Sequence, residues 1–118
     1  MFKLAISDTV EFPVRLAFND AGTRREFTLK LQGKRLAQAD IAATFRDEPD
    51  LSTDDFLRRH LTGWADQRLV VNDDGSPAAF GAEALGVLLG AMGAAGLIFA
   101  AYLEAVGQAA TAGGRAKN

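Results

Sequence analysis

Cysteine is absent from this 118-residue sequence, and histidine and tryptophan each occur only once. Without cysteine, a chain has no disulfide framework, no thiolate zinc site and no thiol redox chemistry, and a reducing compartment is its natural location. We therefore expect a cytoplasmic protein. The lone histidine, His60, has no soft co-ligand for zinc and no nucleophile beside it in the sequence. We interpret it as a histidine in or beside the core, and we predict no catalytic residue, no metal site and no cofactor.

A strong excess of positive charge is also missing. The formal net charge is −2, whereas nonspecific binding to nucleic acid requires a basic stripe, so we predict no nucleic-acid partner. One basic group does occur, and its members are Arg24, Arg25, Lys30, Lys34 and Arg35. Because no exposed aromatic residues are interleaved with it, we favour a solvated outer face. The N-terminus lacks the apolar core and cleavage site of a secretory signal, so we expect the mature chain to start at Met1.

Alternation of apolar residues with other residues predicts a β-hairpin near the N-terminus. Apolar side chains occupy every second position at residues 10–18 and again at residues 27–31, which is typical of strands with one buried face. The sequence Asn-Asp-Ala-Gly at residues 19–22 supplies a turn between the two runs. Pro13 cannot donate a ladder hydrogen bond, so we expect the first strand to lie at an edge of its sheet or to be irregular at this residue.

Two helices are predicted after the hairpin. Residues 34–48 carry apolar side chains at helical spacing, and Pro49 prevents the helix from continuing. Ser52 or Thr53 can cap a second helix, whose apolar stripe continues as far as Trp64. We therefore expect the second helix to deliver Trp64 to the core.

Two acidic segments raise the question of a metal site. If Gly75 is placed at the sixth position of an EF-hand loop, Val70 takes the first ligand position and Gly81 takes the place of the bidentate glutamate, so that motif fails. Asparagine and aspartate tolerate a left-handed backbone and bond their own main chain, so we favour an ordinary turn at residues 72–75 after the short β-prone run 69–71. The other group comprises Asp47, Glu48, Asp50, Asp54 and Asp55. It could hold a hard cation, but we favour a solvated corner between two helices.

Residues 84–103 form a run of twenty residues without any charge, which is long enough to cross a bilayer. No lysine or arginine stands immediately beside this run to anchor it. Each of its glycines would cost about 1 kcal/mol inside one continuous helix of a soluble protein. We favour two shorter helices with a break around residues 93–96, and a single membrane span stays the alternative. The first helix is expected to bury Leu85, Leu88, Leu89 and Met92.

Several short motifs follow one another in a fixed order along nearly the whole chain. A Gly-Trp pair precedes an Asp-Gly turn, a proline, an aromatic residue, a leucine-rich helix, an alanine- and tyrosine-containing helix and an Arg-x-x-Asn end. The residues concerned are Gly63, Trp64, Asp74, Gly75, Pro77, Phe80, Leu85, Leu88, Leu89, Tyr102, Arg115 and Asn118. In this order the sequence resembles the short tail assembly chaperones that tailed bacteriophages and prophages encode. It departs from that family at Gly81, where a capping serine is usual, and in the glycine-rich segment 90–96.

The resemblance implies a non-enzymatic assembly factor in the cytoplasm of a bacterial host. Such proteins bind the long tape-measure protein, keep its apolar helical stretches soluble and help to bring tail-tube subunits to it. The expected partners are therefore the tape-measure protein and also the major tail tube protein, with no membrane, and association into a homo-oligomer stays open.

The expected fold is a single small α+β domain of two layers over residues 1–110. It consists of an N-terminal hairpin followed by about four helices. A flexible tail is expected at residues 111–118. In this fold Trp64 and Phe80 pin the loop between the second and third helices to the core.

Overall fold

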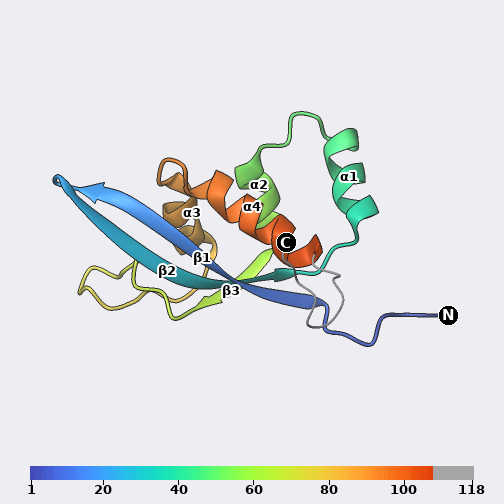
Figure 1. Cartoon of the computed structure of the whole chain (residues 1–118), viewed down its shortest axis with the longest axis horizontal. Helices are drawn as coiled ribbons and strands as arrows, with labels where there is room; N and C mark the ends of the chain where they lie inside the picture. Colours follow the sequence, from blue (N-terminus) through green and yellow to red (C-terminus); the bar gives the residue numbers. More distant parts are fainter. Residues whose placement is uncertain (108–118) are drawn as a thin grey trace, which may run out of the picture.

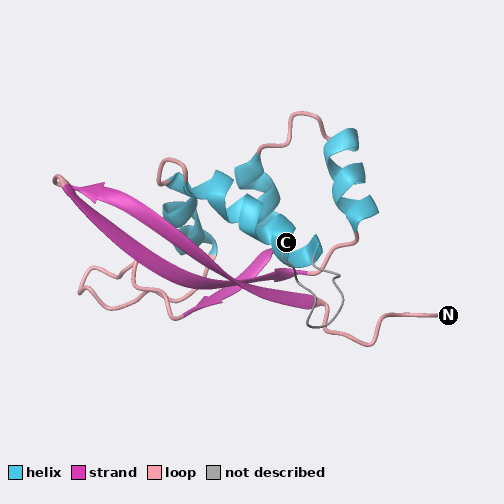
Figure 2. Cartoon of the chain, viewed as in Figure 1, coloured by secondary structure: helices cyan, strands magenta, loops and turns pink. Residues whose placement is uncertain are grey.

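A computed structural model of the chain describes residues 1–107 (Figure 1). In that part, three antiparallel strands in the order β1-β2-β3 form a sheet, and the helices lie on one side of it (Figures 1 and 2). The elements are β1 (Thr9–Asp20), β2 (Thr23–Lys34), α1 (Gln38–Asp47), α2 (Thr53–His60), β3 (Leu61–Ala65), α3 (Ala82–Gly90) and α4 (Ala94–Gly107). The α+β class, the N-terminal hairpin and the four helices are confirmed, although the sheet has a third strand. The tail predicted at residues 111–118, with Arg115 and Asn118, lies outside the described residues.

The hairpin of β1 and β2 closes through a turn of two residues. Asp20 pairs with Thr23, and between them Ala21 and Gly22 both have positive φ angles, of 54° and 90°. Two positive φ angles are the signature of the turn that matches the twist of a hairpin. β1 pairs with β2 on one side and is an outer strand of the sheet, so the edge position predicted from Pro13 is confirmed.

The prediction that the second helix carries Trp64 was wrong, because that helix ends at His60 and the chain continues directly as β3. Ser52 does cap α2, since its hydroxyl accepts a hydrogen bond from the Asp55 N–H. Glycine at position 63 disfavours a longer helix. A Cβ atom on Gly63 would lie 2.5 Å from Oε1 of Gln32, so the end of that side chain on β2 would have to move.

The first helix is shorter than the predicted range 34–48. Lys34 still pairs with Thr9 at the end of the hairpin, and α1 begins only at Gln38. The start of the predicted helix therefore belongs to β2, because Lys34 pairs with β1 and does not enter a helix. The helix ends before Pro49, as predicted.

The uncharged segment folds as two helices joined by a sharp turn. α3 ends at Gly90, Gly93 has a φ of 85°, and the axes of α3 and α4 differ by 108°. The predicted break is thus confirmed, just before the expected position. Met92, predicted to be buried, is 98% exposed because it lies in this turn. Within residues 1–107 no single helix is long and apolar enough to cross a membrane, and α3 and α4 meet the length and composition required only when taken together.

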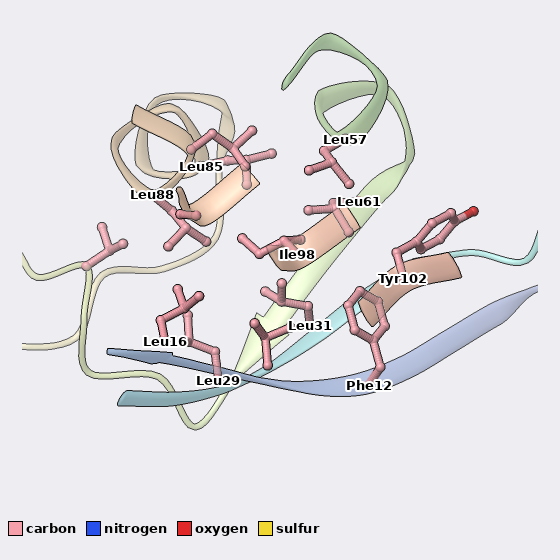
Figure 3. Close-up of a cluster of buried hydrophobic side chains, with 14 of the residues drawn as sticks. Phe12, Leu16, Leu29, Leu31, Leu57, Leu61, Leu85, Leu88, Ile98 and Tyr102 are labelled. Carbon is pink, nitrogen blue, oxygen red and sulfur yellow. The ribbon is translucent and has the colours of Figure 1, made fainter. Parts of the chain in front are cut away.

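The core lies between the sheet and the helices (Figure 3). The strands contribute Phe12, Leu16, Leu29, Leu31 and Leu61, and the facing helices contribute Leu57, Leu85, Leu88, Ile98 and Tyr102. Phe56 joins three helices, because its ring contacts Phe45 of α1 and Phe99 of α4. Tyr102 joins α4 to the sheet: its ring meets Phe12 edge-on, and its hydroxyl donates a 2.7 Å hydrogen bond to the Lys34 carbonyl.

Replacement Tyr102→Phe tests this connection. The variant keeps the ring but loses the hydrogen bond, so we expect the free energy of unfolding to fall by about 1 kcal/mol in urea denaturation at pH 7. Burial raises the pKa of Tyr102 from 10.0 to about 12. The folded protein therefore keeps the phenol proton where the unfolded chain loses it, and this contribution to stability disappears as the pH rises from 10 toward 12. Parallel loss of stability by both proteins over that range would contradict the assignment.

Candidate binding surface

Of the twelve residues that carry the resemblance, six lie in β3 and the long segment between it and α3, namely Gly63, Trp64, Asp74, Gly75, Pro77 and Phe80. Trp64 stands on β3, and its indole nitrogen donates a 3.1 Å hydrogen bond to the Ala78 carbonyl. The Phe80 ring meets the indole edge-on, at 5.2 Å between ring centres. Both rings are half-buried and pack against the core. Together they attach the segment between β3 and α3 to the border of the core. Tyr102 lies apart from them, on α4.

The acidic motif at residues 72–75 is a turn. Gly75 has a φ of 87°, and its N–H donates to the Asn72 carbonyl over 2.9 Å. The Asp74 carboxylate accepts hydrogen bonds from the hydroxyl and the N–H of Ser76, at 2.6 and 2.9 Å, which lower its pKa below the ordinary value. Pro77 then forms an isolated bridge with Val71. The carboxylate of Asp74 therefore accepts hydrogen bonds within the turn itself.

A buried glutamine holds the same segment in place, and the sequence analysis did not identify it. Gln67 is 4% exposed. Its amide nitrogen donates to the carbonyls of Val70 and Ala78, and its side-chain oxygen accepts from the N–H groups of Leu69 and Val70. Together with the Val71–Pro77 bridge and the hydrogen bond from the Ala78 N–H to the Val70 carbonyl, these four hydrogen bonds hold the two ends of this loop together. No sequence signal marks this residue, because its burial depends on the return of the chain at Ala78.

Several of the ionisable groups that could have suggested chemistry are engaged in ion pairs. Glu48 receives two hydrogen bonds from Arg59, at 2.6 and 2.8 Å, and these lower the pKa of the carboxyl. Asp54 lies 3.8 Å from Arg58. In the basic group, Arg25 pairs with the hairpin residue Asp20, Arg24 with Glu26 and Lys30 with Asp66. Across residues 1–107, no cluster of three or more histidine, cysteine, aspartate or glutamate side chains could hold a metal ion.

His60 stands at the border of the core. Its ring lies 4.5 Å from the ring of Phe56, and its Nδ1 atom is buried without a hydrogen-bond partner in the described part of the chain. Burial lowers the pKa of His60, and the positive charges of Lys34 and Arg59 lower it further. The ring is therefore neutral at pH 7, which agrees with a histidine beside the core.

Exposed apolar side chains gather in two places among the described residues. One set lies in the N-terminal segment and comprises Met1, Phe2, Leu4 and Ile6. The other set surrounds the turn between α3 and α4. We call it the α3–α4 corner and define it by Val87, Met92 and Leu97, which are 63%, 98% and 55% exposed.

A pocket of about 250 Å³ adjoins the α3–α4 corner. It is lined by Phe18, Leu69, Val70, Val87, Leu88 and Ala91. All of these side chains are apolar, so the pocket suits an apolar side chain from a partner. The corner and the pocket share Val87 and form the candidate binding surface.

No protein-family model, no curated protein and no solved structure matches the chain. Its function is therefore argued from the chemistry of its surfaces and from the order of its sequence motifs.

The role of Gln67 is tested by Gln67→Leu, which keeps the size of the side chain but removes all four hydrogen bonds. The N–H groups of Leu69 and Val70 lose their partner, whereas the carbonyls of Val70 and Ala78 keep a second donor, so the free energy of unfolding should fall by about 2 to 4 kcal/mol in chemical denaturation. The matched control is Gln38→Leu at an exposed position, with an expected change below about 0.5 kcal/mol. Equal effects of the two substitutions would refute the role given to Gln67.

The neutral state of His60 predicts a specific pH dependence of stability. Its pKa is lowered in the folded protein from 6.5, so the unfolded chain takes up a proton first as the pH falls below 6.5, and stability is lost there. One such proton changes the slope by at most about 1.36 kcal/mol per pH unit. His60→Gln should therefore lose less stability than the wild type between pH 7 and pH 5 in paired urea titrations. Superimposable pH profiles would show that His60 titrates normally in the folded protein.

Proposed function

We propose that this protein is a non-enzymatic tail assembly chaperone of a tailed bacteriophage or prophage, acting in the cytoplasm of the bacterial host. In this role it binds apolar helical stretches of the tape-measure protein and helps to bring major tail tube subunits to them. The observation that carries the proposal is the α3–α4 corner, where Val87, Met92 and Leu97 are exposed and Val87 also lines an apolar pocket. The order of sequence motifs supplies the identity of the client.

The chemistry of the corner favours an apolar helical client. No charged residue occurs between Glu83 and Glu104, so a client that covers the corner does not have to remove a charge of residues 84–103 from water. Apolar contact of this kind yields about 25 cal/mol for each Å² buried. A helix can lay one apolar face on such a surface and place one side chain in the pocket.

The mobility of methionine suits a chaperone that covers many related segments. Met92 is unbranched and almost fully exposed at the apex of the corner, and flexible methionine side chains adapt to partners of different shape. Val87 and Leu97 lie on the two adjoining helices. Together they offer a small adaptable surface that does not require one fixed client sequence.

The proposal is tested by co-expression with the tape-measure protein of the same phage or prophage. The double substitution Met92→Glu with Leu97→Glu places two carboxylates on the corner, and burying them against an apolar client is unfavourable. We expect at least about a tenfold loss of co-purified tape-measure protein. Both residues are exposed, so the variant should keep the wild-type melting temperature.

The matched control is Thr28→Glu, which adds a carboxylate at an exposed position of β2 and should leave co-purification unchanged. Equal recovery of the client by the corner variant and the wild type would contradict the assignment of the surface. Failure of the wild type to bind the tape-measure protein would contradict the function. The single-span alternative for residues 84–103 predicts a different result, since the chain would then sediment with membranes and require detergent.

A further inference from the structure

The first strand leaves one side of the sheet open to another chain. β1 pairs with β2 along twelve residues, and no further strand follows it in the described part of the chain. Exposed backbone groups on such an edge are ready to pair with an added strand. Pro13 has no N–H to give, so an added strand pairs best with the stretch that precedes it.

Beside this stretch of β1 is a groove of about 510 Å³. Its walls are residues 9–13 of β1 on one side and Ala101, Glu104 and Ala105 of α4 on the other, with Arg35 at its end. The side chains of Val10 and Phe12 point into the core next to it. The small alanine side chains leave space for larger apolar groups on the core side of an added strand.

The N-terminal segment has the pattern of a strand that lacks a partner. In residues 1–8, which we call the arm, Phe2, Leu4 and Ile6 alternate with smaller or polar residues and are 99%, 72% and 54% exposed. The N-terminal end of the arm extends away from the sheet (Figure 1), whereas Leu4 and Ile6 line a pocket with the start of α1 and Val106 of α4. This alternation is typical of a half-buried strand, although the arm has no regular structure on its own.

The base of the arm is held so that it points away from the groove of its own chain. The Arg35 side chain donates a 2.8 Å hydrogen bond to the Ser7 carbonyl, and the Arg35 N–H donates a 2.6 Å hydrogen bond to the Asp8 carbonyl. To reach its own groove, the arm would have to fold back at these two residues and break both bonds. A second copy of the chain meets no such obstacle.

Residues 2–12 are self-complementary when two copies run antiparallel with Ser7 opposite Ser7. In that register Phe2 lies opposite Phe12 and Leu4 opposite Val10 on the core side, while Ile6 lies opposite Asp8 next to the two-fold axis. On the outer side Lys3 lies opposite Glu11. Aromatic pairs, apolar pairs and pairs of opposite charge directly across an antiparallel ladder each stabilise it.

We propose that two copies of this chain exchange their N-terminal arms and form a two-fold dimer. The arm of each copy adds to β1 of the other as an antiparallel strand at residues 9–12, and Phe2 and Leu4 enter the groove between β1 and α4. Reciprocal exchange closes the assembly, because both copies use the same surface. The two sheets then continue into each other across the two-fold axis.

The first experiment is sedimentation equilibrium of the full chain and of variants in the arm. The wild type should dimerise, and Phe2→Glu should weaken the dimer at least about tenfold. Lys3→Glu and Glu11→Lys should each weaken it, and the double variant Lys3→Glu with Glu11→Lys should recover most of the loss because it restores opposite charges. A wild type that stays monomeric, or charge variants that do not compensate, would overturn the proposal.

A cross-link tests the register. The chain contains no cysteine, so Ser7→Cys introduces a single thiol at the proposed two-fold axis, and mild oxidation should give a covalent dimer. The control Thr23→Cys, at the far end of the hairpin, should stay monomeric under the same conditions. Equal cross-linking of both variants would refute the register. Met92→Glu should leave dimerisation unchanged. If Met92→Glu dissociated the dimer and Phe2→Glu did not, the interface would lie at the α3–α4 corner and the proposal would be overturned.

Discussion

Gly93 adopts a φ of 85°, and this lets the chain turn by 108° between α3 and α4. Because of this turn, α4 lies along the sheet with Ile98 and Tyr102 in the core, and α3 buries its leucines beside it. A straight continuation would carry one of the two helices away from the sheet. The same turn places Met92 at an exposed apex. The core and the candidate binding surface therefore depend on one backbone conformation.

Local patterns predicted those parts of the fold whose cause is local. The alternation in residues 10–18 and 27–31 reflects one buried face of the hairpin, and glycine in an uncharged run marks the break between α3 and α4. Trp64 was misplaced because the position of buried Leu61 fits the apolar stripe of a helix as well as the buried face of a strand. The strand forms because it can pair with the free edge of β2, which is distant in sequence. The burial of Gln67 likewise depends on the carbonyl of Ala78, eleven residues away. The structural role of such residues depends on contacts distant in sequence, so it can be recognised only in the folded structure.

Of the candidate site, the sequence indicated the residues around Trp64 and the turn at Asp74, which organise the segment between β3 and α3. The exposed surfaces lie elsewhere, at the α3–α4 corner and in the arm. The arm leaves the body at the opposite end from that corner (Figure 1). Arm exchange as proposed would therefore leave both corners accessible, and a dimer with two corners could hold one long apolar client at two points, which raises its apparent affinity.

The two methionines of the chain, Met1 and Met92, provide a direct test of the central claim. Met92 lies on the α3–α4 corner and Met1 in the arm, and both side chains are exposed. In a spectrum of methionine ¹³C-methyl groups, each surface therefore gives one signal. Titration with an apolar helical peptide of the tape-measure protein should shift the Met92 signal and leave the Met1 signal in place. A stationary Met92 signal at saturating peptide, or a shift confined to Met1, would contradict client binding at the corner.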